Sequence, residues 1–365
     1  MALTDLTLTH FRNHAATRLS RLARFNLLVG ENGAGKTNVL EAISLLAPGR
    51  GLRRARLEEM AQGGSQGGSQ AGFAVAARLD PGDGADNVAL GTGTQPQRPS
   101  RRRVQVNGAE ASAAALGEWL SLAWLTPAMD RLFADTAGAR RRYLDRLALA
   151  MEPGHARHAA RYEAAMRERN RLLAEDAMPD PRWFAGVEAA MAEHGAALAQ
   201  GRARLVGRLS EALAVLPEEP FALPALALEP GGPLEEDVLR AALETGRPRD
   251  RAAQRTLTGP HRDELVVTMA RTGLPAAQCS TGEQKAMLVS LTLAHAGLAA
   301  QGRPLILLLD EVAAHLDPLR RSALFERLAA SGAQVWLTGT EREPFAGLDA
   351  GAAVWRVSGG AVERL

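Results

Sequence analysis

The chain has 365 residues, 46% of them apolar, which suffices for a large core and for two or three lobes. Aromatic residues make up only 4%, which argues against a base-stacking surface for single strands. The formal net charge of +2 excludes a global positive field, so any nucleic-acid-binding surface has to be a local basic patch.

Location follows from the apolar runs and the cysteine count. The N-terminal sequence has no apolar stretch after a charged start, so we expect no secretory signal. The longest apolar run, Leu305–Leu309, is far too short to span a bilayer. The lone cysteine, Cys279, excludes a disulfide within the chain, and we interpret it as a small packed residue and not a reactive thiol. These features predict a cytoplasmic protein with no membrane partner.

The first predicted elements are strands. Leu6 and Leu8 alternate with polar residues, and the apolar run Phe25–Val29 follows. This run leads into G-E-N-G-A-G-K-T, which fits the P-loop pattern G-x-x-x-x-G-K-[ST] at every fixed position. A helical pattern comes next and stops at Pro48. A chance match in a loop is the alternative, and the flanking strand and helix argue against it.

A P-loop binds a nucleoside triphosphate, because the N–H groups of its glycine turn and of the following helix N-terminus cradle phosphates. Of the 43 lysine and arginine residues, all are arginine except Lys36 and Lys285. Lysine is retained where a compact ammonium on a long stem has to reach the β- and γ-phosphates. Lys285 directly follows S-T-G-E-Q, and for it a position on a solvated helix face is an equal alternative to a functional role. The predicted ATP-binding residues of this motif are Gly30, Glu31, Asn32, Gly33, Ala34, Gly35, Lys36 and Thr37.

A small β subdomain is predicted after the P-loop helix. The repeat G-G-S-Q-G-G-S-Q at Gly63–Gln70 has linker composition, so we expect a flexible surface loop without chemistry. Strand-like runs follow at Phe73–Leu79, Val88–Leu90 and Val104–Val106, separated by turn residues. They predict an antiparallel sheet.

The next block is helical. After the apolar run Leu120–Thr126, the sequence becomes rich in Ala, Arg, Glu and Leu with helical spacing. It predicts amphipathic helices at Arg140–Leu149, His158–Leu173 and Trp183–Leu213. A proline-rich stretch, Pro217–Pro233, precedes one more helix at Leu234–Thr245.

From about Leu257 the chain is expected to rejoin the N-terminal part in one sheet. The predicted organisation is therefore an N-terminal half of an ATPase head with the β subdomain (1–126), an inserted helical lobe (127–250) and the C-terminal half of the head (251–365).

A second half-site is predicted near the C-terminus. The unbroken apolar run Leu305–Leu309 is typical of a buried parallel strand, and it ends in Asp310 and Glu311. Ligands of open α/β sheets bind at this carboxyl edge. We expect Asp310 to hold Mg²⁺ together with Thr37, and Glu311 to orient or deprotonate the attacking water. Lys36 and Glu311 are the candidate catalytic residues; the alternative is that the two carboxylates cap the next helix.

The string S-T-G-E-Q at Ser280–Gln284 precedes this strand. Its position before Asp-Glu resembles the ATP-binding-cassette arrangement, in which a Ser-x-Gly-x-Gln string of one subunit contacts the γ-phosphate held by another. A serine hydroxyl, a glycine amide and a helix N-terminus can together donate to an anion. Ser280, Gly282 and Gln284 are accordingly candidate ATP ligands. A simple capping box is the alternative.

The length of the stretch between Thr37 and Ser280 then distinguishes among the classes of cassette-type ATPase. It is far longer than a transporter ATPase needs and far too short for long coiled-coil arms. Over essentially its full length the chain resembles the RecF family of bacterial recombination mediators. The matching strings are F-R-N (Phe11–Asn13), the P-loop, G-R-G-L-R (Gly49–Arg53), R-R-R-Y-L-D (Arg140–Asp145), T-G-P-H-R-D-E-L (Thr258–Leu265), S-T-G-E-Q-K and D-E-V-A-A-H-L-D.

The resemblance implies an α/β fold: a P-loop NTPase head of the ABC/SMC type with a β subdomain and an inserted helical lobe. It implies a slow, DNA-stimulated ATPase that uses ATP and Mg²⁺ and dimerises on ATP. It also implies binding of single- and double-stranded DNA at gaps or junctions to help load the recombinase, with RecR and RecO as partners. Arg12, in F-R-N, is assigned to the nucleotide site with this match.

Two departures from the cassette pattern accompany the resemblance. The strand after Asp-Glu reads V-W-L-T-G-T (Val335–Thr340), without the usual histidine. The start of the helical lobe reads T-P-A-M-D (Thr126–Asp130), without the usual glutamine. Both losses fit a slow switch better than a fast motor.

Three arginine clusters are candidate DNA contacts, with solvated faces as the default interpretation. The first follows the P-loop helix, so ATP-driven dimerisation would align two copies into a basic groove that grips phosphates without reading bases. We rank this cluster highest. The second is predicted to be a mobile loop, and the third could equally line the helical lobe. The clusters are Arg50, Arg53, Arg54 and Arg56; Arg98, Arg101, Arg102 and Arg103; and Arg140, Arg141 and Arg142.

Other assignments remain open. His261, Arg262 and Asp263 have too few metal-type neighbours for a zinc site and are expected to be structural or part of an intersubunit contact. The alternative functions are the ATPase subunit of a membrane ABC transporter and a structural chromosome-associated protein in which ATP is a static clamp.

Overall fold

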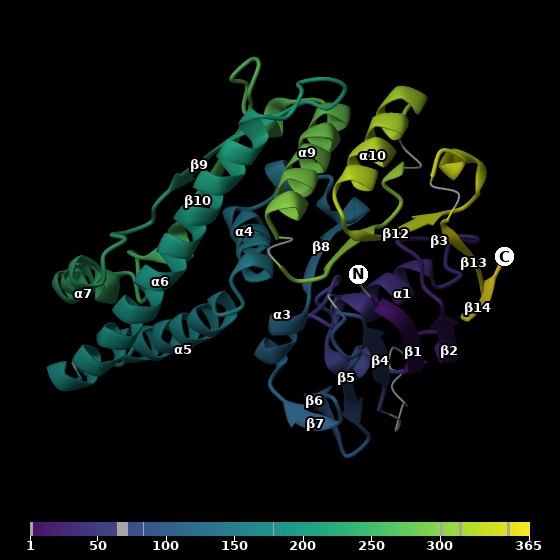
Figure 1. Cartoon of the computed structure of the whole chain (residues 1–365). Helices are drawn as coiled ribbons and strands as arrows, with labels where there is room; N and C mark the ends of the chain where they lie inside the picture. Colours follow the sequence, from purple (N-terminus) through teal and green to yellow (C-terminus); the bar gives the residue numbers. More distant parts are fainter. Residues whose placement is uncertain are drawn as a thin grey trace. The chain divides into compact units, whose positions relative to one another are not determined.

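The computed structural model describes residues 3–63, 72–82, 84–177, 179–299, 302–313, 316–348 and 351–365. It contains two compact units (Figure 1). The first unit is made of Met1–Asp130, Pro217–Phe221 and Leu288–Leu365, and the second unit is made of Arg131–Leu216 and Ala222–Met287.

The first unit holds two six-stranded sheets. One is antiparallel, in the order β2-β1-β4-β5-β6-β7: β1 (Leu3–Phe11), β2 (His14–Ser20), β4 (Ala74–Leu79), β5 (Val88–Gln95), β6 (Arg98–Val106) and β7 (Ala109–Ala111). The other has the order β14-β13-β3-β12-β11-β8: β3 (Phe25–Val29), β8 (Ser121–Leu125), β11 (Leu305–Leu309), β12 (Gln334–Gly339), β13 (Ala353–Ser358) and β14 (Ala361–Arg364). In this second sheet only β14 runs antiparallel to its neighbour.

The burial of each strand explains its sequence. The four central parallel strands β3, β12, β11 and β8 are buried along their whole lengths, as their apolar runs require when both faces of a sheet are covered. In the antiparallel sheet, β4 alternates buried Val75, Ala77 and Leu79 with exposed residues, so only one of its faces lies on the core. Helix α1 (Lys36–Ser44) contacts both β1 and β12 and therefore lies between the two sheets. Other helices of this unit are α2 (Leu57–Met60), α3 (Leu116–Trp119), α10 (Pro318–Ala330) and the part of α9 (Thr281–Ala299) from Leu288 onward.

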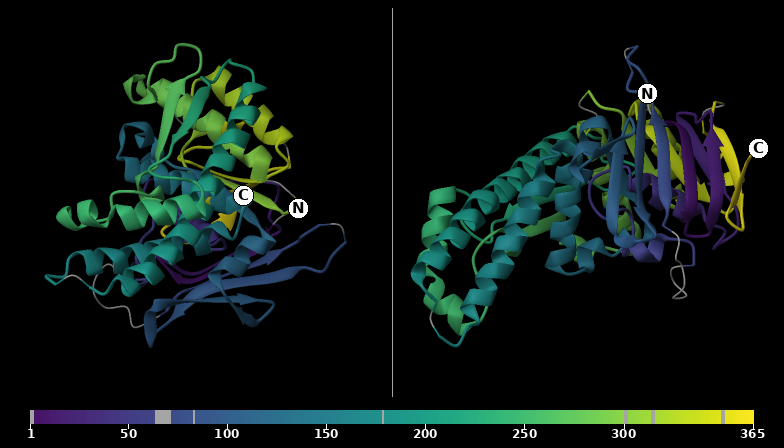
Figure 2. Two further views of the ribbon diagram at one scale, coloured as in Figure 1. Left: turned by 90° about the vertical axis from the view of Figure 1, so that its left-hand side faces the viewer. Right: turned by 90° about the horizontal axis from the view of Figure 1, so that it is seen from below.

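The second unit is mainly helical. Helices α5 and α6 lie side by side (Figure 2), and α7 packs on α6 around a core of Tyr162, Met191, Leu198, Leu239 and Leu243. The helices are α4 (Ala137–Met151), α5 (His155–Leu173), α6 (Pro181–Ala214), α7 (Glu236–Thr245) and α8 (Arg247–Ala252), and α9 (Thr281–Ala299) begins in this unit. An antiparallel pair, β9 (Pro224–Glu229) and β10 (Glu264–Met269), completes it.

The predicted antiparallel subdomain is confirmed by β4, β5 and β6, and the four predicted helices are confirmed by α4, α5, α6 and α7. The expectation that everything after Leu257 joins the main sheet is wrong for β10, which pairs with β9. Strand β9 lies within the proline-rich stretch, where no strand was predicted. This pairing places residues 222–287 in the second unit, whereas the helical lobe was expected to end at 250.

Two further expectations concern the surface. Beyond Gly63, the repeat predicted as a flexible loop lies outside the described residues. Over the part of the chain that the structure describes, none of the helices is both long enough and apolar enough to cross a membrane.

Candidate functional site

The P-loop is the turn between β3 and α1, both in the first unit. Gly33 and Gly35 have φ values of +82° and +116°, in the left-handed region that glycine adopts without a steric penalty. Gly35 is the N-cap of α1 and offers no side chain to the first turn of the helix. The N–H groups at the start of α1 are therefore not taken by a side-chain cap, which suits a phosphate cradle.

Lys36 lies over the turn from which it projects. Its Nζ donates to the backbone carbonyls of Gly30 at 2.6 Å and of Glu31 at 2.9 Å. Burial lowers the pKa of Lys36, and the carboxylates of Glu311 and Asp310 act in the opposite direction. The structure thus places this ammonium near both acidic residues that follow β11.

Thr37 and Asp310 come together from opposite ends of the chain. The Thr37 hydroxyl lies 3.0 and 3.1 Å from the two carboxylate oxygens of Asp310 and donates to them. Asp310 is only 6% exposed, and this burial raises the pKa of its carboxyl group, while hydrogen bonds from Thr338 and Thr37 oppose the rise. The predicted pairing of these two residues is present.

The chemistry of this pair fits Mg²⁺. A hydroxyl and a carboxylate are the hard oxygen ligands that this cation prefers, and it commonly takes one or two protein ligands with water and phosphate oxygens. A buried carboxylate whose pKa burial raises gains from a neighbouring cation. Over the described residues no group of three or more His, Cys, Asp or Glu side chains gathers that could hold a metal, so a protein-only cage is not formed there.

Glu311 has an uncommon backbone conformation. Its φ is +53°, a left-handed value for a non-glycine residue, and such values cluster at functional sites. Its N–H donates to the Thr338 hydroxyl at 2.8 Å, and the same hydroxyl donates to Asp310 at 2.9 Å. Thr338, at the end of β12, therefore holds both acidic residues.

Thr338 is a site residue that sequence reasoning missed. The segment Val335–Thr340 was noted only for its missing histidine. A hydroxyl residue near the carboxyl end of a fully buried parallel strand was the available signal, because such ends meet at the ligand edge of the sheet.

The F-R-N turn braces the P-loop from the antiparallel sheet. The Asn13 side-chain amide donates to the Ala34 carbonyl at 2.9 Å and accepts from Asn38 of α1 at 2.8 Å. From the C-terminal hairpin, the Gly360 N–H donates to the same Ala34 carbonyl at 3.1 Å. A Cβ atom on Gly360 would lie 2.0 Å from the Asn13 carbonyl oxygen, so only glycine fits there.

Arg12 makes its contacts with α1 and the segment after it. Its guanidinium forms a two-point pair with Glu41, at 2.7 and 2.9 Å, and donates to the Glu59 carbonyl at 2.8 Å. Glu41 is fully buried and also accepts from Arg53 at 3.0 Å. The structure assigns Arg12 a bracing position beside the P-loop helix, and its contact with ATP stays a prediction. Glu41 was not singled out because the apolar pattern of its helix conceals a buried carboxylate.

The Ser280–Gln284 segment lies in the second unit. The Ser280 hydroxyl and N–H each donate to the Glu283 carboxylate at 2.8 Å, and the Glu283 N–H donates back to the Ser280 hydroxyl at 3.3 Å. This is the capping box that the sequence left as an alternative. Ser280 and Gly282 are exposed, so a role in ATP binding by these two residues stays a prediction.

Gln284 and Cys279 lie inside the same turn. Gln284 is buried and donates from its amide to the Cys279 carbonyl at 2.9 Å, so it supports the turn from within, and a direct ATP contact for it has no support from this geometry. Cys279 is buried, and burial raises the pKa of its thiol, which agrees with a packed residue.

In the string D-E-V-A-A-H-L-D, which begins at Asp310, residues 314 and 315 lie outside the described residues.

The first arginine cluster follows α1 and is exposed at Arg50, Arg53, Arg54 and Arg56. Arg53 also donates to the Asn38 side chain at 2.6 Å, so this cluster is joined to the P-loop helix. The second cluster is not the mobile loop that was predicted, because it lies in β6, where cross-strand pairing with β5 fixes it. The third cluster lies in α4, and two of its members are bonded inside the second unit. Arg140 pairs with Glu264 at 2.6 Å, and Arg141 donates to the Asp263 carbonyl at 2.8 Å.

The strings R-R-R-Y-L-D and G-P-H-R-D bind each other. Arg202 of α6 pairs with Asp145 at 2.8 Å and with Asp263 at 2.8 Å, so it bridges the two strings. His261 contacts the Tyr162 hydroxyl at 2.8 Å. This geometry supports the structural interpretation of His261 and Asp263.

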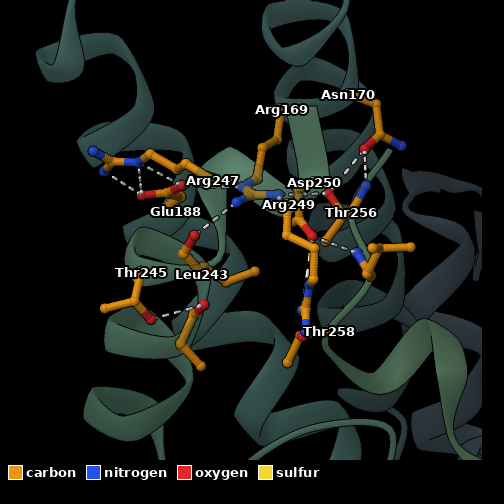
Figure 3. A network of polar contacts seen from close by, with 12 residues as sticks. Arg169, Asn170, Glu188, Leu243, Thr245, Arg247, Arg249, Asp250, Thr256 and Thr258 are labelled. Carbon is orange, nitrogen blue, oxygen red and sulfur yellow. Dashed lines mark hydrogen bonds and ion pairs between the residues drawn. The ribbon is translucent and has the colours of Figure 1, made fainter. Parts of the chain in front are cut away.

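A second buried network holds the other end of the helical unit (Figure 3). Arg169 is fully buried and donates to Glu188 at 3.0 Å and to Asp250 at 2.7 Å. Because removing one partner would strand a buried charge, this network fixes how α5, α6 and α8 meet.

Three comparisons with known proteins extend these observations. The family model described as RecF/RecN/SMC N terminal domain matches residues 2–362. A protein of Mesorhizobium japonicum named DNA replication and repair protein RecF is 49% identical, with 95% of this chain and 93% of that protein covered. A protein of Brucella suis with the same name is 45% identical, with 99% and 95% covered.

Among solved structures, the recombination mediator protein RecF-ATPrS in the RecFOR pathway has a TM-score of 0.86 at 22% identity, covering 100% of this chain and 98% of that one. The Smc head domain of Pyrococcus furiosus bound to the C-terminal domain of ScpA has a TM-score of 0.56 at 16% identity, covering 100% and 96%. The fold is therefore that of an ABC/SMC-type ATPase head. A membrane-transporter subunit is not favoured by these matches.

Proposed function

Because the chain belongs to the RecF family of DNA replication and repair proteins, we propose that it is a DNA-binding ATPase that dimerises when ATP is bound. The observation that carries this proposal is the meeting of Thr37 and Asp310 beside Lys36, at the carboxyl edge of the parallel sheet. Motifs from the two ends of the chain assemble one phosphate-binding edge there.

In the proposed site the P-loop N–H groups and Lys36 contact the β- and γ-phosphates of ATP. The Lys36 ammonium exchanges the carbonyls of Gly30 and Glu31 for phosphate oxygens. Thr37 and Asp310 would hold Mg²⁺, which would neutralise negative charge on the phosphates.

Glu311 is the proposed base for the attacking water. The Thr338 hydroxyl accepts the N–H of Glu311 and so holds the left-handed backbone from which the Glu311 carboxylate projects. With neither the cassette histidine nor the cassette glutamine in place, we propose slow hydrolysis that DNA stimulates. ATP then acts mainly as a switch between monomer and dimer.

The proposed dimer shares its ATP sites between subunits. The exposed Ser280 and Gly282 of one copy donate to the γ-phosphate held by Lys36 of the other, and for this the Ser280 hydroxyl exchanges the Glu283 carboxylate for a phosphate oxygen. In this arrangement Gln284 acts indirectly, through the Cys279 carbonyl.

The proposed substrate is DNA with a gap or a single-strand/double-strand junction, where the protein helps to load the recombinase. The first arginine cluster is the proposed contact with the phosphate backbone of single- and double-stranded DNA. RecR and RecO are the proposed protein partners, and the cytoplasm is the proposed location.

Gel filtration of the whole chain with and without ATP and Mg²⁺, followed by DNA binding of each peak, tests this proposal. We expect a monomer without ATP, a dimer with it, and stronger DNA binding by the dimer. An elution volume that does not change with ATP, combined with equal DNA binding, would contradict the switch. Complete absence of ATP turnover with DNA present would favour the static clamp.

A further inference from the structure

Strand β6 carries Arg98, Arg101, Arg102 and Arg103, and its pleat sends neighbouring side chains to opposite faces. Arg102 points to the core face. It donates to the carbonyls of Gly49 at 2.7 Å and Ala47 at 3.1 Å, and it also donates to the Leu45 carbonyl. These carbonyls follow the P-loop helix α1, so Arg102 fixes β6 against the segment that leads into the first arginine cluster.

The other three arginines gather on the surface. Arg98, Arg101 and Arg103 line one hollow together with Gln95 and Glu110. Among the residues that the structure describes, none forms an ion pair with these three guanidinium groups. The three guanidinium charges exceed the single carboxylate charge of Glu110, so the hollow keeps a net positive charge that favours an anion.

The residues of the sheet beside this hollow are small. Gly93 of β5 lies opposite Arg103, and Gly91 lies opposite Gln105. Ala74 and Ala76 of β4 face the same two glycines from the other side and are exposed. Small residues therefore lie beside the arginines on this face of the antiparallel sheet, with Ala74 and Ala76 exposed and Gly93 covered by the backbone of Phe73.

We infer that Arg98, Arg101 and Arg103 form a second DNA-binding surface, which holds the phosphate backbone of duplex DNA. The inference rests on the proposed DNA-binding function and adds to it a surface on the antiparallel sheet. Guanidinium groups bind phosphate oxygens through two parallel hydrogen bonds. Arg101 and Arg103 are two strand residues apart, about 7 Å, so each contacts a different phosphate.

Duplex DNA is the favoured occupant for two reasons. Single strands are held by stacking on aromatic side chains, and the hollow is lined by arginine, glutamine and glutamate. A rigid strand with fixed arginine spacing also matches a rigid duplex better than a flexible single strand. Contacts to phosphates carry no sequence information, so this surface binds without base preference.

The test is the salt dependence of duplex binding by the full-length protein with ATP and Mg²⁺. For duplex DNA the slope of log K against log salt is about 0.9 per phosphate contact. Arg101→Gln with Arg103→Gln is expected to lower the magnitude of this slope by about 2 and to weaken binding equally for unrelated sequences. The matched control is Arg161→Gln with Arg167→Gln, two exposed arginines of helix α5 in the second unit.

The outcomes distinguish a failure of the second DNA-binding surface from a failure of the proposed DNA-binding function. A parent protein that binds no DNA overturns the proposed function, and this inference with it. If the parent binds and the Arg101/Arg103 variant keeps the parental slope, the second surface alone is overturned. It is also overturned if the control loses as much slope as the variant. Loss by the variant only, with unchanged ATP binding and thermal unfolding, supports it, and Arg98→Gln should then lower the slope by about one more contact.

Discussion

The Thr338 hydroxyl donates to the Asp310 carboxylate at 2.9 Å, from the end of one parallel strand to the end of its neighbour. The same hydroxyl accepts the N–H of Glu311 at 2.8 Å. One side chain thus orients the residue expected to hold Mg²⁺ and the residue expected to act as the base. The ligand edge of this sheet depends on a threonine that belongs to neither known motif.

Thr338→Val tests this dependence, because it keeps the shape of the side chain and removes both hydrogen bonds. It leaves the Glu311 N–H without this acceptor and removes one of the two hydroxyl donors to the buried Asp310 carboxylate, which should lower the free energy of unfolding by about 1–3 kcal/mol. Urea unfolding and ATP turnover should both show the loss. Thr338→Ser keeps the hydroxyl and should retain most of both; equal behaviour of the Val and Ser variants would refute the role of the hydroxyl.

Lys36→Arg should reduce ATP turnover by about 10²-fold or more, the size typical of losing one preorganised donor. A planar fork cannot replace a compact ammonium that contacts the Gly30 and Glu31 carbonyls inside a tight turn. Steady-state ATPase and nucleotide-binding assays measure the effect. Lys285→Arg is the matched control, the same exchange at the one other lysine. Near-normal turnover by Lys36→Arg would remove the P-loop assignment.

Glu311→Gln should separate ATP binding from hydrolysis. The amide retains the size of the carboxylate and a contact to water but cannot take a proton, so turnover should fall by about 10²–10⁴-fold. The ATP-bound dimer should then accumulate in gel filtration. The exposed carboxylate Glu363 provides the control exchange, Glu363→Gln. Parental turnover by the Glu311 variant would mean that another group is the base.

Asp310→Asn should make the nucleotide-free protein more stable at neutral pH. Burial raises the pKa of Asp310 above its ordinary value of 3.8, so the folded state binds this proton more tightly than the unfolded state does. The stabilising contribution of the protonated form is complete below pH 3.8 and is lost as the pH rises through the raised value. The variant lacks this ionisation and escapes the loss.

The measurement is the urea midpoint of parent and Asp310→Asn across the acid-to-neutral range, without nucleotide. The advantage of the variant should be largest at neutral pH and should shrink as the pH falls below 4. Asp86→Asn, at an exposed carboxylate, should show no such trend. A variant that is less stable than the parent at neutral pH would show that the hydrogen bonds from Thr37 and Thr338 outweigh the burial.

Much of the parallel sheet was predictable because its strands are short apolar runs that end in motif residues. Leu305–Leu309 followed by Asp310, and Phe25–Val29 followed by the P-loop, each identify a buried strand and the edge at which it ends. The meeting of Thr37 and Asp310 follows from that edge. Thr338 did not follow, because its strand carries no motif and its partners become visible only in the paired sheet.

The second unit was less predictable for a different reason. Helices show a period in sequence, but strand pairing does not, so β9 and β10 remained hidden in a proline-rich stretch and a turn-rich segment. Charge clusters were ambiguous for the same reason. Arg101, Arg102 and Arg103 are identical in sequence chemistry, yet the pleat of β6 sends the middle residue to backbone carbonyls and its neighbours to the surface.

The central claim is that each ATP site is shared between two copies of the chain. Ser280→Arg should leave ATP binding by each monomer intact, since Lys36, Thr37 and Asp310 are unchanged. It should prevent dimerisation, because a long cation would fill the space meant for the γ-phosphate of the facing subunit. Lys36→Met should lose ATP binding at its own P-loop while keeping an intact Ser280.

The most direct measurement is the ATPase activity and dimerisation of a mixture of Ser280→Arg and Lys36→Met chains, each folded and each inactive alone. If the sites are shared, every mixed dimer holds one site with both defects and one intact site, so part of the activity should return on mixing. If the site lies within one chain, one partner lacks the serine and the other lacks the lysine, and no mixture recovers. Recovery is the predicted result, and its complete absence would contradict the shared site.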